Sequence, residues 1–269
     1  MARGTIRLGG MALPNGVLVH GPTAWGAAVR LPDGRIKVAS ARKHGIASRV
    51  THPLLRGPAK LVDAFAVLPQ VKRGLPEAKL PFERPGVLGM MAASTVAIRG
   101  IRGSRGLGPL ARELASGLVS FAPALYALRG GELAAYHGAE HVSIGSYEHG
   151  EARPKEHERC GSHLVGPLLA TSALGNALAS RAPEGVRTPA RAAAAVGAAA
   201  ASVELFGWMT RNPDRRLARV LARPGHELQA RFATAEPSPA QLEVARAALE
   251  ACVELEEQQP EEARDDRHR

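Results

Sequence analysis

The chain has 269 residues, two cysteines and a formal net charge of +10 at pH 7. Two cysteines cannot build the disulfide framework of a small secreted protein, so we expect a reducing compartment. The positive charge favours acidic partners, but the arginines are spread along the chain and aromatic residues make up only 4% of it. Stacking surfaces for bases are therefore not expected, and neither is a nucleic-acid partner.

Residues 1–52 are predicted to form a β-rich region. Gly16–His20 has the composition of a short apolar strand. Residues 25–31 and 35–40 flank Pro-Asp-Gly at 32–34, where proline presets φ and glycine accepts a positive φ, so we expect a hairpin. The glycines at positions 9, 10 and 16 are expected to mark tight turns before it.

Residues 53–258 are predicted to form a helical domain, and residues 259–269 a disordered charged tail. Apolar residues between Leu54 and Leu68 recur at helical spacing, and Pro69 and Gly74 are expected to end that helix. Ser238 is followed by proline, which is typical of a helix N-cap. Further helices are expected at about 86–99, 107–129, 131–149, 163–181, 189–211 and 238–258. The predicted fold is α+β and mainly helical, with a small N-terminal β-hairpin region followed by a helical bundle.

Four stretches lack charged residues, at 85–98, 114–128, 164–180 and 192–203. Each is shorter than the roughly twenty residues that span a bilayer. They are rich in Ala, Gly and Ser, and Arg or Glu flanks most of them. Composition therefore favours buried core helices or interfacial segments over true membrane spans.

The sequence Tyr-His-Gly-Ala-Glu-His at 136–141 is the clearest indication of chemistry. His137 and His141 are four residues apart, so on a helix they share one face and can converge on a divalent ion. Glu140 can then act as a base for a bound water. Glu148 falls on the same face, although two glycines, Gly138 and Gly145, weaken the predicted helix.

A second cluster follows at His157 and Cys160. Their spacing lets both reach one point, and Cys160 followed by glycine resembles turns that present a thiolate to zinc. The alternatives are a buried thiol and a surface loop histidine, and His149 or His163 could replace His157. Imidazole and thiolate suit zinc, while imidazole and carboxylate also suit iron or manganese. The predicted metal ligands are His137, His141, Glu148, His157 and Cys160, with Glu140 as the catalytic residue.

Four segments carry a resemblance to a known family. They are residues 9–34, residues 53–57, residues 136–162 and residues 224–245, and the third contains the most specific motifs. From about residue 9 to 255 the chain resembles the YqhQ-like bacterial family, a domain of unknown function to which metal dependence is attributed. The resemblance implies integral membrane helices between the motifs and no established activity.

The leading hypothesis is a metal-binding bacterial protein with hydrolase-like chemistry, associated with the cell membrane, with the cytoplasm as the alternative location. The second is a non-catalytic membrane or scaffold protein, whose polar cluster is a structural metal site or a hydrogen-bond network. The third, a nucleic-acid-binding protein, is suggested only by charge. The sequence names no substrate, native metal or oligomeric state.

Overall fold

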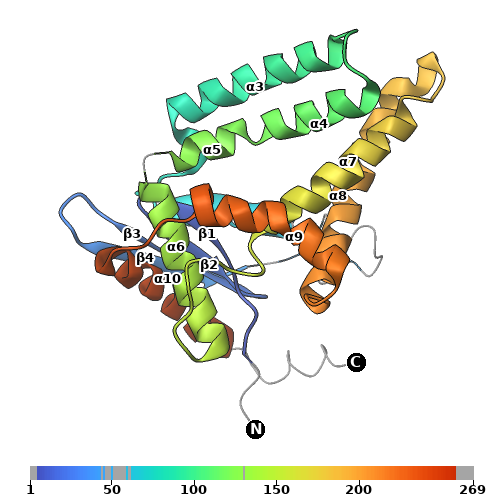
Figure 1. Ribbon diagram of the computed structural model, residues 1–269. Coiled ribbons are helices and arrows are strands. Elements are labelled where there is room, and N and C mark those ends of the chain that lie inside the picture. The colour runs from blue at the N-terminus through green and yellow to red at the C-terminus, as the bar shows by residue number, and fades with distance from the viewer. Residues whose placement is uncertain are drawn as a thin grey trace.

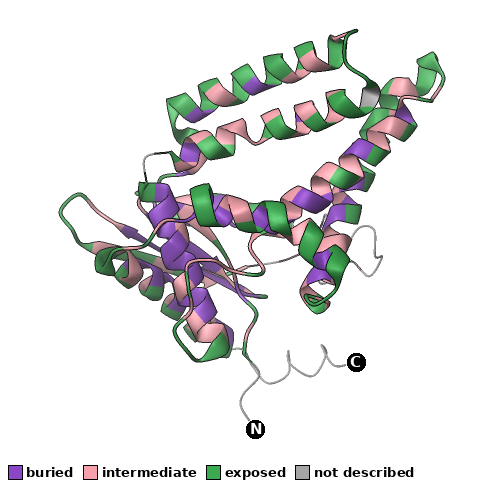
Figure 2. Cartoon of the chain, viewed as in Figure 1, coloured by how far each residue is buried: buried purple, intermediate pink, exposed green. Residues whose placement is uncertain are grey.

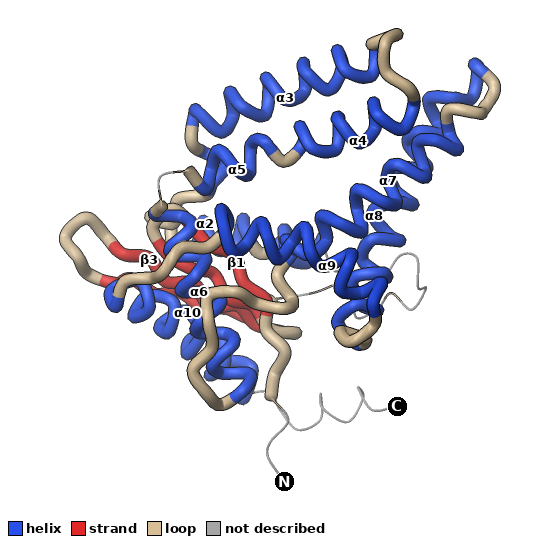
Figure 3. The backbone as a smooth tube through the Cα atoms, in the orientation of Figure 1, coloured by secondary structure: helices blue, strands red, loops and turns tan. Residues whose placement is uncertain are grey.

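A computed structural model describes residues 5–43, 45, 50, 59, 62–129 and 131–258. The strands form one four-stranded sheet. It lies at one end of the molecule, and helices make up most of the rest (Figure 1, Figure 3). The fold is thus α+β and mainly helical, as predicted. The predicted tail at 259–269 and the predicted domain boundary at 52/53 lie outside the described residues.

The strands are β1 (Gly9–Leu13), β2 (Gly16–His20), β3 (Ala24–Arg30) and β4 (Ile36–Arg42), paired antiparallel in that order. Gly34 has a φ of +86° at the turn between β3 and β4, which confirms the predicted hairpin. The interpretation of Gly9 and Gly10 as turn residues was wrong, because both lie in β1 and pair with β2.

The remaining elements are α2 (Leu68–Gly74), η2 (Pro81–Glu83), α3 (Pro85–Gly103), α4 (Pro109–Ser120), α5 (Ala122–Leu128), α6 (Glu132–His149), η3 (Gly161–Leu164), α7 (Val165–Ala179), η4 (Glu184–Val186), α8 (Arg187–Arg211), α9 (Arg216–Leu228), the π-helical turn η5 (Gln229–Ala233) and α10 (Pro239–Glu257). Most of these match the predicted helices. Three differences have local causes.

Proline explains each of the three differences. The expected helix at 107–129 is divided at Phe121, because Pro123 lies in the first turn of α5 and cannot continue a helical hydrogen-bond ladder. Residues 62–66 are helical and stop at a turn at Val67, so the expected helix does end before Pro69, but Pro69 then lies in the first turn of the unpredicted helix α2. Helix α9 was not predicted because Pro224 lies inside it. The part of the Leu54–Leu68 prediction that covers 54–58, 60 and 61 lies outside the described residues.

Both faces of the sheet are covered. One set of alternating strand residues, including Val17 and Val19, packs against α6 and α10. The other set, including Leu18 and Trp25, packs against residues 67–80 around α2. Because successive strand residues point to opposite faces, the sheet builds two apolar clusters from one set of strands. Sheet and α6 therefore share a core, which fixes the position of the helix that carries the His-Glu-His motif.

The C-terminal helix α10 lies directly on the sheet. A Cβ added at Gly26 of β3 would lie 2.4 Å from the Ala248 carbonyl oxygen, so only glycine permits this approach. Ser238 caps the helix by accepting a hydrogen bond from the Gln241 N–H, which confirms the predicted N-cap. Cys252 is fully buried, as expected of a small apolar side chain.

Helices α3, α4, α5, α7 and α8 form two long pairs beside the rest of the fold. Helix α3 packs along α4 and α5, α7 packs along α8, and α4 contacts α7 (Figure 1). Much of their surface is exposed (Figure 2). The exposed side chains include large apolar ones such as Leu88, Met91, Val96, Leu110, Leu118, Leu174 and Val196.

Within the described residues, one helical stretch is long and apolar enough to cross a membrane. It covers Glu184–Arg211, 28 residues, and 22% of its most apolar window is buried in the fold. Length and composition alone do not separate such a helix from a core helix of a soluble protein.

His20 makes the stability of the fold depend on pH. Burial, and then the nearby charge of Lys43, lower the pKa of His20 to about 4. Lys43 Nζ donates to His20 Nδ1 over 3.2 Å. Binding of a second proton at Nδ1, which would charge the ring, is therefore disfavoured in the folded state. Since the unfolded chain binds this proton at the ordinary pKa, stability is retained above about pH 6.5 and falls as the pH drops towards 4.

We expect His20→Gln to remove this dependence, whose full size is on the order of 3 kcal/mol. Urea unfolding at pH 7.5 and 4.5 measures it, with His149→Gln, at an exposed histidine, as control. An equal loss of stability in acid for His20→Gln and the control would contradict the assignment.

Candidate metal centre

Helix α6 supplies the two histidines of the motif and is continuous from Glu132 to His149, despite its internal glycines. Nearly every face of its middle is buried (Figure 2). Gly138 explains one of these contacts, because a Cβ there would lie 2.1 Å from the Ala235 carbonyl oxygen. The Ala235 N–H donates to the Ala134 carbonyl over 2.9 Å. Glycine thus lets the segment after η5 lie directly against the helix.

Three side chains converge beside α6. His137, His141 and Cys160 each offer one ligand atom, and these atoms all lie within 4.8 Å of one another. His137 Nε2 is 3.5 Å from Cys160 Sγ. Nitrogen and sulfur ligands of a tetrahedral zinc ion lie about 3.5 Å apart when their bonds have ordinary lengths. The cluster could therefore hold a metal ion.

Both imidazoles are oriented by backbone carbonyls. His137 Nδ1 lies 2.8 Å from the Ala233 oxygen, and His141 Nδ1 lies 2.6 Å from the Lys155 oxygen. A carbonyl can only accept, so each Nδ1 carries the proton and each Nε2 keeps its lone pair. Burial lowers the pKa of His141, which also favours the neutral ring. Metal-binding histidines characteristically make this second hydrogen bond.

The loop that carries Cys160 is held by a buried amide. Gln229 is fully buried, and its Oε1 accepts from the His157 N–H over 2.8 Å. Its Nε2 lies 3.2 Å from the His157 carbonyl, 2.7 Å from Ser162 Oγ and 3.0 Å from His163 Nδ1. Reasoning from ligand types missed this residue. The only indication in the sequence was its place in the C-terminal motif segment.

Glu140 is 5% exposed and faces the same space. A Cβ at Gly10 would lie 2.5 Å from its Oε1, so β1 approaches this carboxyl group closely. Burial raises the pKa of Glu140, and nearby His137 and His157 partly offset that shift. Its Oε2 has no hydrogen-bond partner among the described residues. Buried polar atoms normally have partners, so this oxygen is suited to contact a cation or a proton donor bound beside it.

Glu148 and His157 pair with each other instead of joining the three converging donors. His157 Nε2 lies 3.3 Å from Glu148 Oε2, and its Nδ1 accepts from the Arg159 N–H. The Arg159 guanidinium also forms an ion pair with Glu148. Burial alone would raise the pKa of Glu148, but the His157 hydrogen bond and the Arg159 charge lower it below its usual range. Their role as metal ligands stays a prediction.

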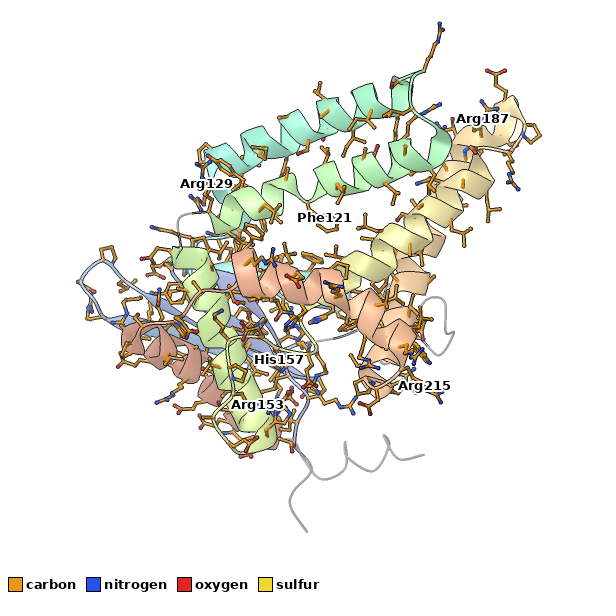
Figure 4. The ribbon with its side chains drawn as sticks, viewed as in Figure 1. Phe121, Arg129, Arg153, His157, Arg187 and Arg215 are labelled. Carbon is orange, nitrogen blue, oxygen red and sulfur yellow. The ribbon has the colours of Figure 1, made fainter. Side chains whose placement is uncertain are left out.

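His157 nevertheless lies next to the cluster, with its ring centroid 5.5 Å from that of His141. Figure 4 labels it beside α6. The other two candidates have different partners. His149 is exposed and bonds to the Gly145 carbonyl of its own helix, whereas His163 bonds to Gln229.

A cavity of about 450 Å³ reaches all three donors and Glu140. A second cavity of about 380 Å³ shares His157 and Arg159 with the first as lining residues. The cluster therefore lines a cavity large enough for a small molecule, and Arg159, the partner of Glu148, lines both cavities.

Comparison with protein families gives one match. Residues 132–255 match the model of a family described as a protein of unknown function (DUF1385). The chain contains a DUF1385 domain. That domain runs from α6 into α10 and includes the whole donor cluster, whereas the sheet lies outside the matched residues. Searches of curated proteins and of solved structures gave no match.

Proposed function

We propose that the DUF1385 domain of this chain holds a zinc ion at His137, His141 and Cys160. The observation that carries the proposal is the orientation of the two rings. Each Nδ1 is bonded to a carbonyl, which leaves the Nε2 lone pair available to a metal, and His137 Nε2 lies 3.5 Å from the Cys160 sulfur. Two imidazoles and one thiolate form a donor set that suits zinc better than iron or manganese.

Three protein ligands leave a fourth position open, which is typical of catalytic rather than structural zinc sites. A divalent ion there would supply the Lewis acidity that makes water nucleophilic at neutral pH. Glu140 lies next in sequence to His141, is buried, and has one oxygen without a hydrogen-bond partner in the described part of the chain. It would accept the proton of the attacking water, and we therefore propose a metal-dependent hydrolase-like enzyme.

A second candidate is a structural, non-catalytic metal site. The proximity of His157 favours it, because rotation of that ring away from Glu148 would bring a fourth protein ligand towards the ion. A closed shell of four protein ligands would leave no room for a reacting water.

We also propose that the protein associates with a bacterial membrane. The apolar stretch Glu184–Arg211 and the exposed apolar side chains of α3, α4 and α7 support this location. The resemblance to the YqhQ-like family favours the same location. Fractionation of cells into membrane and soluble pools tests it, and recovery only in the soluble pool would contradict it.

Glu140→Gln separates the catalytic from the structural proposal. We expect the variant to bind zinc as the unchanged protein does and to hydrolyse activated esters about 10²–10⁴-fold more slowly, the usual contribution of a general base. The measurement is ester hydrolysis by zinc-loaded protein, with zinc content determined in parallel. Equal rates in the two proteins would rule out Glu140 as the base and favour the structural site.

A further inference from the structure

The cavity beside the metal centre has one polar end and one apolar end. The polar end is formed by α6 and the loop at 157–162, with His137, Glu140 and Cys160. The apolar end is formed by β1, α5 and the first turn of α6, with Met11, Leu128 and Leu133. Leu133 lies one helical turn before His137, so the lining changes from apolar to polar between these two residues of α6, and Ile144 beyond His141 is apolar again.

The apolar end belongs to a packed cluster rather than to a loose surface. Val87, Ala127 and Leu133 are buried together, with Leu128 packed against them. Around the cavity, α5 contributes Ala124, Ala127 and Leu128, none of which has a polar side chain. A sugar or a nucleotide would meet no hydrogen-bond partners on this wall, whereas a hydrocarbon chain would meet only apolar side chains.

The apolar surface continues outside the cavity. Ala124 is exposed although it lines the cavity, and its neighbour Leu125 is 39% exposed. A ligand with a hydrocarbon chain could therefore approach the cavity along apolar side chains, without crossing a charged rim on α5.

We infer that the cavity takes a single-chain amphiphile, with its carbonyl head group at the metal donors and its acyl chain along β1 and α5. This inference rests on the proposed metal centre and names the substrate class of the same site. Hydrolysis of an acyl ester in this pose consumes one water and breaks the acyl C–O bond. Glu140 takes the proton of the water and returns it to the leaving alcohol, which leaves the fatty acid.

The test uses a series of n-alkyl hydroxamates from two to ten carbons, because the hydroxamate head binds zinc and only the chain varies. On zinc-loaded full-length protein, below micelle-forming concentrations, we expect affinity to rise about fourfold for each added methylene until the apolar end is filled. Calorimetry measures the dissociation constants, and the zinc content is determined after each titration.

Ala127→Phe fills the apolar end and should abolish the increase with chain length, while acetohydroxamate still binds within about twofold of its original affinity. Ala124→Phe changes an exposed residue at the rim of the cavity. It should reduce the rise in affinity with chain length without disturbing the packing of the core. Ala122→Phe, on the same helix but outside the cavity lining, is the matched control and should leave the increase unchanged.

The outcomes separate this inference from the proposed function. If acetohydroxamate binds in a zinc-dependent way but longer chains add nothing, the amphiphile inference is overturned and the metal centre stands. If no hydroxamate binding depends on zinc, the metal centre is overturned. Binding of n-alkyl carboxylates to zinc-free protein then tests the apolar wall alone. An affinity that does not change with chain length would overturn the amphiphile inference as well.

Discussion

The His137→Ala/His141→Ala variant is expected to lose more than a hundredfold in zinc affinity. Each of the two histidines offers one ring nitrogen to the donor cluster, so the variant removes two of three ligands. Removing a single residue that hydrogen-bonds to a metal ligand already lowers metal affinity about 10–100-fold. Removing two ligands should therefore lower it further. Competition with a chelator of known affinity measures the change.

The matched control is His149→Ala/His226→Ala. It also removes two histidines, but both are exposed and neither belongs to the converging group. It should bind zinc as the unchanged protein does. Similar zinc affinity in the two double variants would disprove the assigned centre.

Cobalt substitution tests the thiolate separately. A charge-transfer absorption from sulfur to cobalt is expected in the unchanged protein and should disappear in Cys160→Ser. Cys252→Ser is the control, because Cys252 is fully buried against the sheet and lies outside the cluster. A sulfur–cobalt absorption that survives in Cys160→Ser would show that Cys160 is not a ligand.

Gly138→Ala is expected to destabilise the fold by about 2 kcal/mol. The added Cβ would lie 2.1 Å from the Ala235 carbonyl oxygen, which no rotamer change can relieve because the obstacle is backbone. Overpacking of this kind costs about 1–3 kcal/mol. Replacing glycine by alanine inside a helix gains only about 1 kcal/mol from helix propensity, so the cost exceeds the gain. Chemical unfolding measures the net effect.

The same change should weaken zinc binding. Ala233, whose carbonyl orients His137, lies in the segment that the new Cβ would push away from α6. We expect a loss of about tenfold in zinc affinity, the lower end of the effect of disturbing a second hydrogen bond.

Gly89→Ala is the control for this prediction. Gly89 is also inside a helix, α3, but a Cβ there meets no atom of the described residues within 4 Å. That variant should be more stable by about 0.5–1 kcal/mol, because alanine loses less backbone entropy in a helix. If Gly138→Ala were stabilising to the same extent, the close packing of α6 against Ala235 would be disproved.

Much of the fold followed from local patterns. The hairpin at 32–34 and the N-cap at Ser238 depend on backbone preferences of a few neighbouring residues, and both formed as expected. Strand β1 and helix α9 did not follow, because Gly9 and Pro224 oppose the structures in which they lie. In β1, pairing with the rest of the sheet overrides a weak local preference.

The sequence by itself determined the donor types and their spacing. A spacing of four positions places the two histidines on one helix face whatever surrounds the helix, because the helical repeat is a local property. Only the tertiary structure decided which donors meet. The carbonyls of Ala233 and Lys155, the buried amide of Gln229 and the ion pair of Arg159 with Glu148 all come from segments distant in the chain or on another element. Such contacts depend on how the chain packs, and no local pattern encodes them.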